Sequence, residues 1–382
     1  MKKLTVLLVL FISFFSLRED VFAVENPLSV SNNKFGIHIL FTEEINDAAR
    51  LVNSSGGDWG YVTIPIQSGD RNITKWQKFM NDARSLHVVP IIRLATEGDY
   101  FNTKVWRKPK EEDVLDFANF LNSLYWPTKN RYIIIFNEPN RADEWGGVVN
   151  PSEYANLLNY AVSVFKSKSP DFFIISAGFD NASINSTNAM NEYDYMKLMN
   201  SAVPGIFAQV DGLGSHSYPN PGFSQSPKKQ DSQSIATFRF EKNLISSFAQ
   251  KDLPVFIAET GWINQSLSDD QIASYFAESY ETVWSDNTIV AISPFLLRAD
   301  SGPFTGFSLI KNNGDKTERY KKIESISKIK GSPLLNPIVL GEKTEKNINV
   351  PVKDFSGEND IKESLITVPP VLKLLFRKLI QN

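Results

Sequence analysis

The sequence predicts an α/β fold, a (β/α)8 barrel (TIM barrel) followed by an appended C-terminal tail. Eight short apolar runs alternate with stretches of helical spacing between about residues 33 and 330. The runs are rich in Ile, Val and Phe and do not alternate strictly with polar residues, as expected of strands that are buried on both faces. A strand followed by a helix, repeated eight times, is typical of this barrel.

The expected strands are short and evenly spaced. They cover residues 35–40, 60–66, 88–94, 132–136, 172–177, 210–215, 255–258 and 289–295. An open doubly wound sheet is the main alternative. Such a sheet usually has a Gly-rich phosphate-binding turn after its first strand, and the run ILFTE at 39–43 contains no glycine. The barrel is therefore the favoured prediction.

Three of the intervening helices have clear sequence signals. At 112–121, apolar side chains lie three and four residues apart, which is the spacing of an amphipathic helix. Pro151 suits the first turn of a helix, where a backbone N–H would have no partner. Ser268 can cap the start of another helix, and Asp269 and Asp270 favour its first turn through the helix dipole.

Composition limits the classes of ligand. The 382-residue chain has 42% hydrophobic residues and a formal net charge of −3, with Lys and Arg scattered along it. This balance suits a neutral ligand and gives no indication of nucleic-acid binding. Cysteine is absent, and only three histidines occur, so a disulfide framework is excluded and a zinc cluster would be hard to assemble. We expect neither a cofactor nor a metal.

The N-terminus predicts export. Residues 1–23 resemble a secretory signal peptide, because Lys2 and Lys3 precede an apolar run at 4–17 and the residues at 21–23 suit cleavage. An uncleaved membrane anchor is the alternative, although the run is shorter than the roughly 17–25 residues that a spanning helix prefers. Either way we expect a secreted or extracytoplasmic protein.

The C-terminal extension at 331–382 differs in composition from the barrel domain at 33–330. It is mostly polar and charged, with weak periodicity. Its last part, 371–380, is a candidate for a basic amphipathic helix. This helix either docks on the barrel or a partner, or makes a peripheral contact with a membrane or cell surface. We expect the protein itself to be a monomer.

Two motifs each place a glutamate at the end of an expected strand. NEPN at 137–140 follows the fourth strand, and AETGW at 258–262 ends the seventh. Because the C-terminal ends of all strands meet at one mouth of a parallel barrel, Glu138 and Glu259 should face each other there. A facing pair of carboxylates is what cleavage of a glycosidic bond needs. Either motif alone is weak, but their joint placement predicts a glycosidase.

These motifs resemble those of glycoside hydrolase clan A, the superfamily of retaining (β/α)8-barrel glycosidases, over about residues 33–330. The resemblance implies that Glu138 is the general acid/base, that Glu259 is the nucleophile and that Asn137 binds the sugar 2-hydroxyl. The ETGW run is similar to that of β-1,3-glucanases, and NEPN is similar to that of β-xylosidase- and cellulase-like relatives. The implied protein is an exported retaining glycosidase that cleaves a β-linked poly- or oligosaccharide.

In the implied double displacement, the two carboxyl groups have different tasks. Glu259 must stay ionised to attack the anomeric carbon, and Glu138 must arrive protonated to release the leaving group. Repulsion by the charge on Glu259 should raise the pKa of Glu138 until the glycosyl-enzyme forms, after which Glu138 acts as a base. Retention needs carboxyl groups about 5–5.5 Å apart, whereas a gap of about 6.5–9.5 Å would admit a water for inversion.

The resemblance also implicates residues after the sixth and eighth strands. In the clan, strand six often ends with a histidine or tyrosine that touches the nucleophile, and GSHSYP at 214–219 matches this pattern with His216 and Tyr218. Both are expected to donate to Glu259. Many members have a tryptophan at the end of strand eight, where this chain offers Phe295. This departure predicts a differently shaped sugar subsite.

Four further residues are candidates for substrate contacts, each with a structural alternative. Arg93 in the third strand needs a carboxylate partner, either Glu259 or one in a purely structural ion pair. His38 at the end of the first strand either reaches the sugar or is a satisfied core histidine. Trp145 and Trp262 follow the motif strands, and either stack on sugar rings or pack their loops.

Two residues are weaker candidates. Gln67, at the end of the second strand, is a further candidate polar contact. His87 precedes the third strand, on the side of the barrel opposite the mouth, and is expected to be structural.

Two other classes of protein remain as alternatives. One is a catalytically inactive carbohydrate-binding barrel, although the presence of both glutamates argues against lost catalysis. The other is a surface interaction scaffold that makes contacts through its basic C-terminal segment. A serine hydrolase and a nucleotide enzyme are not indicated, because the chain has neither a Gly-x-Ser-x-Gly elbow nor a phosphate loop.

Overall fold

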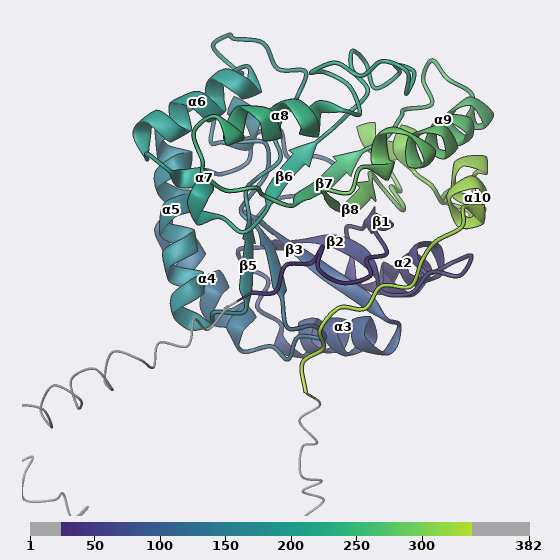
Figure 1. Ribbon diagram of the computed structural model, residues 1–382, viewed down its shortest axis with the longest axis horizontal. Helices are drawn as coiled ribbons and strands as arrows, with labels where there is room; N and C mark the ends of the chain where they lie inside the picture. Colours follow the sequence, from purple (N-terminus) through teal and green to yellow (C-terminus); the bar gives the residue numbers. More distant parts are fainter. Residues whose placement is uncertain (1–23, 338–382) are drawn as a thin grey trace, which may run out of the picture. The chain divides into compact units, whose positions relative to one another are not determined.

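Eight short parallel strands form the centre of the molecule, and helices surround them (Figure 1). The computed structural model describes residues 24–337. The expected signal peptide at 1–23 and the basic segment at 371–380 lie outside these residues. Within the described part, no helix has the length and apolar character needed to span a bilayer.

Each of the eight expected runs contains a strand, so the prediction of the α/β barrel is confirmed at the level of its elements. The strands are β1 (Gly36–His38), β2 (Gly60–Gln67), β3 (Val88–Ala95), β4 (Arg131–Ile134), β5 (Phe172–Ile175), β6 (Leu213–His216), β7 (Val255–Thr260) and β8 (Ile289–Pro294). All of their pairings are parallel.

The strands form two sheets that meet at two seams. β1 to β5 make a five-stranded sheet, and β6 to β8 make a three-stranded sheet. A parallel bridge between Ile175 and Gly212 connects the end of the first sheet to the start of the second, and a further one joins Asp180, after β5, to His216. Another, between Phe35 and Ile292, connects β8 back to β1. Within residues 24–337, the two sheets are thus joined at both seams in the strand order of the predicted barrel.

Glycines allow the backbones to approach closely at both seams. A Cβ added at Gly36 would lie 2.7 Å from the carbonyl oxygen of Ile292, and one at Gly214 would collide with the carbonyl oxygen of Ser176. Real Cβ atoms do not tolerate such contacts, so these two positions require glycine for the seams to close.

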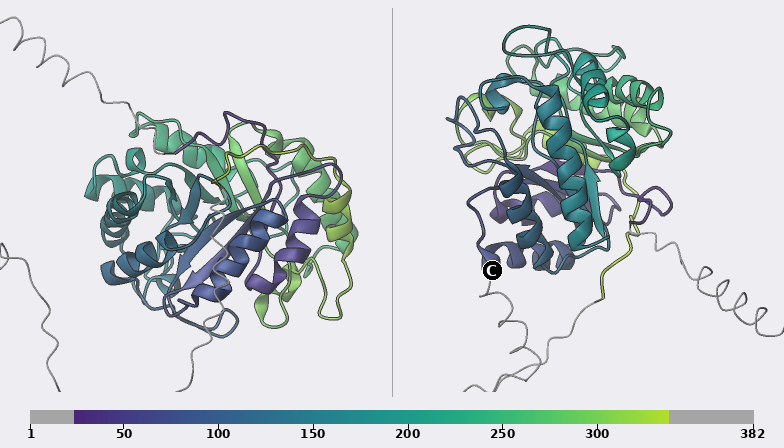
Figure 2. Two further views of the ribbon diagram at one scale, coloured as in Figure 1. Left: turned by 90° about the horizontal axis from the view of Figure 1, so that it is seen from below. Right: turned by 90° about the vertical axis from the view of Figure 1, so that its left-hand side faces the viewer.

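The helices form the outer layer, and Figure 2 shows α4 and α5 side by side along it. They are α2 (Ile45–Val52), α3 (Ile73–Ser85), α4 (Glu111–Asn122), α5 (Pro151–Lys168), α6 (Glu192–Ala202), α7 (Ile206–Gln209), α8 (Thr237–Ser246), α9 (Asp269–Glu281) and α10 (Glu318–Ser325). Short 3-10 turns are η1 (Thr42–Glu44), η2 (Ala142–Glu144), η3 (Val283–Ser285) and η4 (Pro303–Phe307).

The helix starts follow the expected sequence signals. Pro151 occupies the first turn of α5, where the side chain of Asn150 accepts a hydrogen bond from the backbone N–H of Glu153. The side chain of Ser268 caps α9 by accepting from the N–H of Gln271. Each helix buries one apolar face against the strands, which is what holds the outer layer in place.

The core has two layers. Most buried apolar side chains lie between the strands and the helices, while a second cluster that includes Tyr132, Phe173 and Phe256 fills the barrel. Val24 and Leu28 pack against this inner cluster. Residues 331–337 also contact the barrel domain, because Leu335 pairs with Thr128. The filled interior leaves chemistry to the C-terminal ends of the strands.

Candidate active site

The register of two neighbouring strands places a histidine beside a glutamate. His216 at the end of β6 pairs with Glu259 in β7, after a bulge between Ser215 and His216. Bulges re-aim side chains at sheet ends and are common next to active sites. Both residues are therefore presented together at the C-terminal end of the three-stranded sheet.

Glu138 reaches the same place from the loop after β4. β4 ends at Ile134, and Phe136 (φ 64°) and Glu138 (φ 33°) then adopt left-handed conformations. Such conformations cost about 1–3 kcal/mol each and persist only when the surroundings hold them. Here the N–H of Glu138 donates to the carbonyl oxygen of Gly178 (3.1 Å), and the buried Asn140 donates to the carbonyl oxygen of Asp180 (3.0 Å).

Glu138, His216 and Glu259 converge. One polar side-chain atom from each of the three lies within 4.8 Å of those of the other two. The exposed fractions are 8% for Glu138, 0% for His216 and 7% for Glu259. The two motif glutamates, which are 121 positions apart in the sequence (259 minus 138), thus form one buried carboxylate pair, as their positions in the expected strands predict.

Glu259 is surrounded by donors. The hydroxyl of Tyr218 donates to Oε2 (3.0 Å). Nε2 of His38 lies 3.6 Å and Nη1 of Arg93 3.9 Å from Oε1. Burial, then the nearby charges of Arg93 and His216, lower the pKa of His38 well below its usual value, so this ring is neutral. Of the alternatives for Arg93, the structure favours the contact with the glutamate.

Glu138 contacts two basic side chains. Nδ1 of His216 lies 2.8 Å from Oε1, and Nη1 of Arg141 donates to Oε2 at 3.1 Å. Burial alone would raise the pKa of Glu138, but the bond to His216 and the charge of Arg141 outweigh burial and lower the pKa to about 2. The expectation of a raised pKa for Glu138 is therefore wrong.

The role expected of His216 is also corrected. Its closest carboxylate is Glu138, and its Nδ1 lies 3.8 Å from Oε2 of Glu259. Burial lowers the pKa of His216, but the charges of Glu259 and Glu138 and the bond to Glu138 raise it above its usual value. His216 lies between the two carboxylates instead of serving Glu259 alone.

A cleft of about 600 Å³ opens over the pair. Arg93, Asn137, Tyr218 and Phe295 line it, as the sequence predicts. Further lining residues were not predicted, and they come from the loops after β3 to β6 and β8: Tyr100, Phe101, Trp106, Arg141, Asp143, Glu144, Asp180, Phe223, Phe304 and Phe307. These loops have no regular apolar period, so the sequence offers no signal by which they could have been found.

The two tryptophans expected to stack on sugars do not line this cleft. Trp145 and Trp262 are each 1% exposed. Trp262 donates through Nε1 to the carbonyl oxygen of Gln225 (2.7 Å) and packs edge-on against Phe276 of α9. Trp145 packs against Phe136 and Tyr154. Both side chains turn toward the helix layer, so the packing alternative holds.

Of the remaining candidates, one lines the cleft and two have contacts elsewhere. Asn137 lines the cleft, and its buried Oδ1 has no hydrogen-bond partner among residues 24–337. Gln67 donates to the carbonyl oxygen of Gly98 (2.6 Å), which holds the β3 loop. His87 stacks on Trp59 (4.8 Å between ring centroids), in agreement with a structural role.

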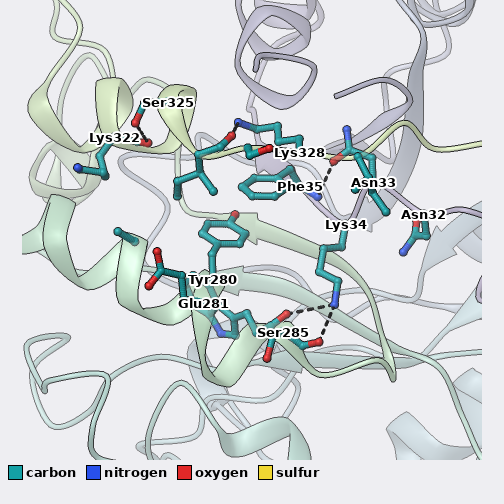
Figure 3. A pocket seen from close by; sticks show the side chains of 15 residues that line it. Asn32, Asn33, Lys34, Phe35, Tyr280, Glu281, Ser285, Lys322, Ser325 and Lys328 are labelled. Atoms are coloured by element: carbon teal, nitrogen blue, oxygen red, sulfur yellow. Dashed lines mark hydrogen bonds between the residues drawn. The ribbon is translucent and has the colours of Figure 1, made fainter. Parts of the chain in front are cut away.

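A second hollow, of about 620 Å³, lies beside the start of β1 and α9 (Figure 3). Two of its basic side chains are occupied by backbone carbonyls, since Lys34 donates to Asp286 (2.7 Å) and Lys328 to Ile323 (2.7 Å). Glu281 is its only acidic lining residue. This hollow lacks a carboxylate pair and is not the reaction site.

The three convergent groups could also contact one metal ion. However, the guanidinium groups of Arg93 and Arg141 already face the two carboxylates. Their positive charges oppose a further cation at the same place. The arrangement is better suited to nucleophilic and acid–base chemistry.

The parallel eight-stranded α/β arrangement, with buried glutamates after β4 and at the end of β7, defines the class of the protein's fold. It is the fold of the clan A glycoside hydrolases, as the sequence resemblance predicts.

Solved structures similar to this chain are glycoside hydrolases. A monomeric β-xylosidase from Caulobacter crescentus CB15 superposes with a TM-score of 0.57 and 15% identity, over 77% of this chain and 68% of that one. A family 39 glycoside hydrolase from Bacteroides cellulosilyticus WH2 gives 0.56 and 16%, over 79% and 64%. A GH5_18 protein from Bifidobacterium longum subsp. infantis gives 0.52 and 12%, over 76% and 77%.

At these identities the likeness establishes the fold. The chain spans about two thirds of the length of the first two structures. No protein-family model and no curated protein sequence matches the chain. Function is therefore argued from the site.

Proposed function

We propose that this protein is a retaining glycoside hydrolase that cleaves a β-linked poly- or oligosaccharide. The observation that supports this most is the buried pair of Glu138 and Glu259, whose polar atoms lie within 4.8 Å of each other. This limit joins one oxygen of each carboxylate, and it is compatible with the gap of about 5–5.5 Å between carboxyl groups that retention needs. The glycosidase fold agrees with this activity.

The chemistry proceeds in two displacements. Glu259 attacks the anomeric carbon while the bond to the leaving oxygen breaks, and Glu138 gives that oxygen a proton. The covalent glycosyl-enzyme is then attacked by water, which loses a proton to Glu138 as the bond to Glu259 breaks. Tyr218 orients Glu259 through its hydrogen bond (3.0 Å), and the free amide oxygen of Asn137 suits a sugar hydroxyl.

The proton for the first step is available within the buried His216–Glu138 pair. A hydrogen bond of 2.8 Å joins the two side chains, and the pKa of His216 is raised by the charges of Glu259 and Glu138. These contacts favour a proton on the ring of His216 and an ionised Glu138. Such a pair titrates as one unit, so its proton reaches the leaving oxygen through Glu138.

Replacement of the nucleophile is the decisive test. Glu259→Ala should abolish turnover of an aryl β-glycoside, and added azide should restore turnover with a product of inverted anomeric configuration. Glu112→Ala, an exposed change on α4, is the matched control and should retain activity. Unchanged turnover by Glu259→Ala would refute the assignment.

Replacement of the acid/base tests the second role. Glu138→Ala should lose about 10²–10⁴-fold in activity on substrates with poor leaving groups. It should lose far less on activated aryl glycosides, because these do not need a proton. Equal losses on both substrate types would contradict the assignment. A panel of β-glucans, xylans, mannans and galactans would then identify the sugar.

Export belongs to the same proposal. The sequence of residues 1–23 supports a cleaved signal peptide, and an exported enzyme would meet extracellular polysaccharide. N-terminal sequencing of protein recovered from the medium should begin near Val24. Recovery only from the cytoplasm, with Met1 retained, would contradict export.

A further inference from the structure

An arginine that the resemblance did not implicate lies directly on the proposed acid/base. Arg141 follows Glu138 by three residues, and its Nη1 donates to Oε2 (3.1 Å). The other edge of the guanidinium forms a two-point pair with Asp143, with Nε to Oδ1 at 3.1 Å and Nη2 to Oδ2 at 2.7 Å. The planar guanidinium of Arg141 thus links Asp143, which lines the cleft, to Glu138. It does so with the fork geometry that arginine provides.

The backbone around this pair is fixed. The carbonyl oxygen of Asp143 accepts from the N–H of Trp106 (2.7 Å), and the N–H of Ala142 donates to Asn188 (2.8 Å). The N–H of Arg141 donates to the carbonyl oxygen of Glu138 (2.9 Å). Three main-chain hydrogen bonds of residues 141–143 thus fix the backbone that carries Arg141, which distinguishes its pair with Glu138 from a loose surface pair.

Other charged groups also face Glu138. His216 from β6 and Arg93 from β3 favour its ionised form, as Arg141 does. Glu259 from β7, Glu144 from η2 and Asp180 from the β5 loop oppose it.

Burial, then the charge of Glu138, raise the pKa of Glu144 to about 7 and also raise that of Asp180. As the pH falls, these two carboxyls are therefore protonated before Glu138. Among the cationic groups that face Glu138, Arg141 has the most exposed side chain, at 36%, compared with 9% for Arg93 and 0% for His216.

We propose that Arg141, held by Asp143, is a positioning residue that fixes the Glu138 carboxylate and stabilises its negative charge. The inference rests on the proposed function for its catalytic meaning. An ionised Glu138 is ready for the second displacement, in which it accepts a proton from water. In the first displacement it depends on the proton of the His216 pair. The rate of the first displacement is therefore expected to depend strongly on whether the leaving group needs a proton.

Spectroscopy of the substrate-free protein tests the inference without any activity. In ¹³C NMR with labelled glutamate, assigned with Glu138→Gln, the wild-type Glu138 signal should remain that of a carboxylate down to about pH 4. Removal of an adjacent opposite charge raises an acid's pKa by about 1–3 units. In Arg141→Met the signal should therefore move toward the protonated form below about pH 5.

Kinetics supply the second readout. Arg141→Met should shift the descending limb of the kcat/KM–pH profile upward by about 1 pH unit or more. It should also narrow the ratio of kcat/KM between activated and unactivated aryl glycosides, because a protonated Glu138 becomes easier to form. Arg141→Lys, which keeps the charge, should recover at least half of the pH shift.

Controls separate this role from a structural one. Arg50→Met removes another arginine–carboxylate pair, on the exposed face of α2. In that pair Arg50 follows Asp47 by three residues and lies 3.1 Å from it, as Arg141 does from Glu138. It should change neither readout. If Arg141→Met does not fold, Arg141→Gln should give the same upward shifts.

An Arg141→Met protein that folds but titrates like the wild type would overturn the proposal. Wild-type protein without glycosidase activity would refute the proposed function, while the NMR titration would still decide whether Arg141 controls Glu138.

Discussion

The two glutamates of the site have different neighbours. Glu259 accepts a hydrogen bond from the neutral hydroxyl of Tyr218 at 3.0 Å, whereas Glu138 has an imidazole at 2.8 Å and a guanidinium at 3.1 Å. Different surroundings are how one site assigns different tasks to two identical side chains. The hydroxyl orients the proposed nucleophile without neutralising it.

Removal of that hydroxyl should therefore impair catalysis more than folding. A hydrogen bond to a charged group contributes about 1.5–3 kcal/mol, so Tyr218→Phe should lower kcat/KM by about 10–100-fold. Steady-state kinetics on an aryl β-glycoside, together with a thermal melt, measure both effects. Tyr193→Phe, which removes a hydroxyl that donates to Ser232 instead (3.0 Å), is the control. An equal loss of kcat/KM in Tyr218→Phe and Tyr193→Phe would contradict a specific role for Tyr218.

Sequence could predict the pair and only part of its surroundings. Glu138 and Glu259 were predictable because strands fix where their ends lie. Trp145 and Trp262 were not, because the direction of a side chain beyond a strand depends on the path of its loop, and both turn into the helix layer. Arg141 had no signal, since nothing in a loop sequence indicates that a side chain folds back onto the residue three positions earlier.

At the scale of elements, the seams are the most demanding part of the barrel. Among residues 24–337, the two sheets meet only through isolated bridges at the seams. At the seam between β5 and β6, the backbone of Gly214 lies so close to Ser176 that no Cβ fits. Pairing there depends on the absence of a side chain.

Addition of one methyl group at this seam should destabilise the fold. Gly214→Ala forces the backbones apart, and overpacking of this kind costs about 1–3 kcal/mol of unfolding free energy. Denaturant unfolding monitored by circular dichroism measures the change. Gly69→Ala is the control, because a Cβ there meets nothing within 4 Å, and it should be close to neutral. Equal stability of the two variants would show that the seam can adjust.

The strands were predictable as elements because buried parallel strands require continuous apolar runs. Their ends were less predictable. The expected fourth strand reaches residue 136, but β4 ends at Ile134 and Phe136 is left-handed. The loop departs early in order to turn Glu138 toward His216. Local apolar character cannot reveal that requirement, which arises from another part of the chain.

At the scale of the whole molecule, two buried acids couple stability to pH. Glu192 of α6 and Glu241 of α8 are each 0% exposed. Burial, then the charge of Glu241, raise the pKa of Glu192 well above its usual value, and burial raises the pKa of Glu241 to about 7. Both folded-state values exceed those of the unfolded chain. The stability they contribute is therefore complete below about pH 4.3 and is lost as pH rises through the folded-state pKa.

The unfolding free energy should consequently fall between about pH 4.5 and 7, by up to about 3 kcal/mol from Glu241. Glu241→Gln removes this group and should flatten the dependence, so that the variant gains on the wild type as pH rises. Denaturant unfolding at several pH values measures the slope. Glu112→Gln, an exposed change, should leave it unaltered. A steeper slope in Glu241→Gln would refute the assignment.

The division of the barrel into two sheets has a mechanical consequence for the site. Glu138 follows a strand of the five-stranded sheet, whereas His216 and Glu259 belong to the three-stranded sheet. The spacing between the two carboxyls therefore depends on how the two sheets pair at their seams. If the proposed glycosidase activity holds, substitutions along these seams, remote from both carboxyls, should alter turnover.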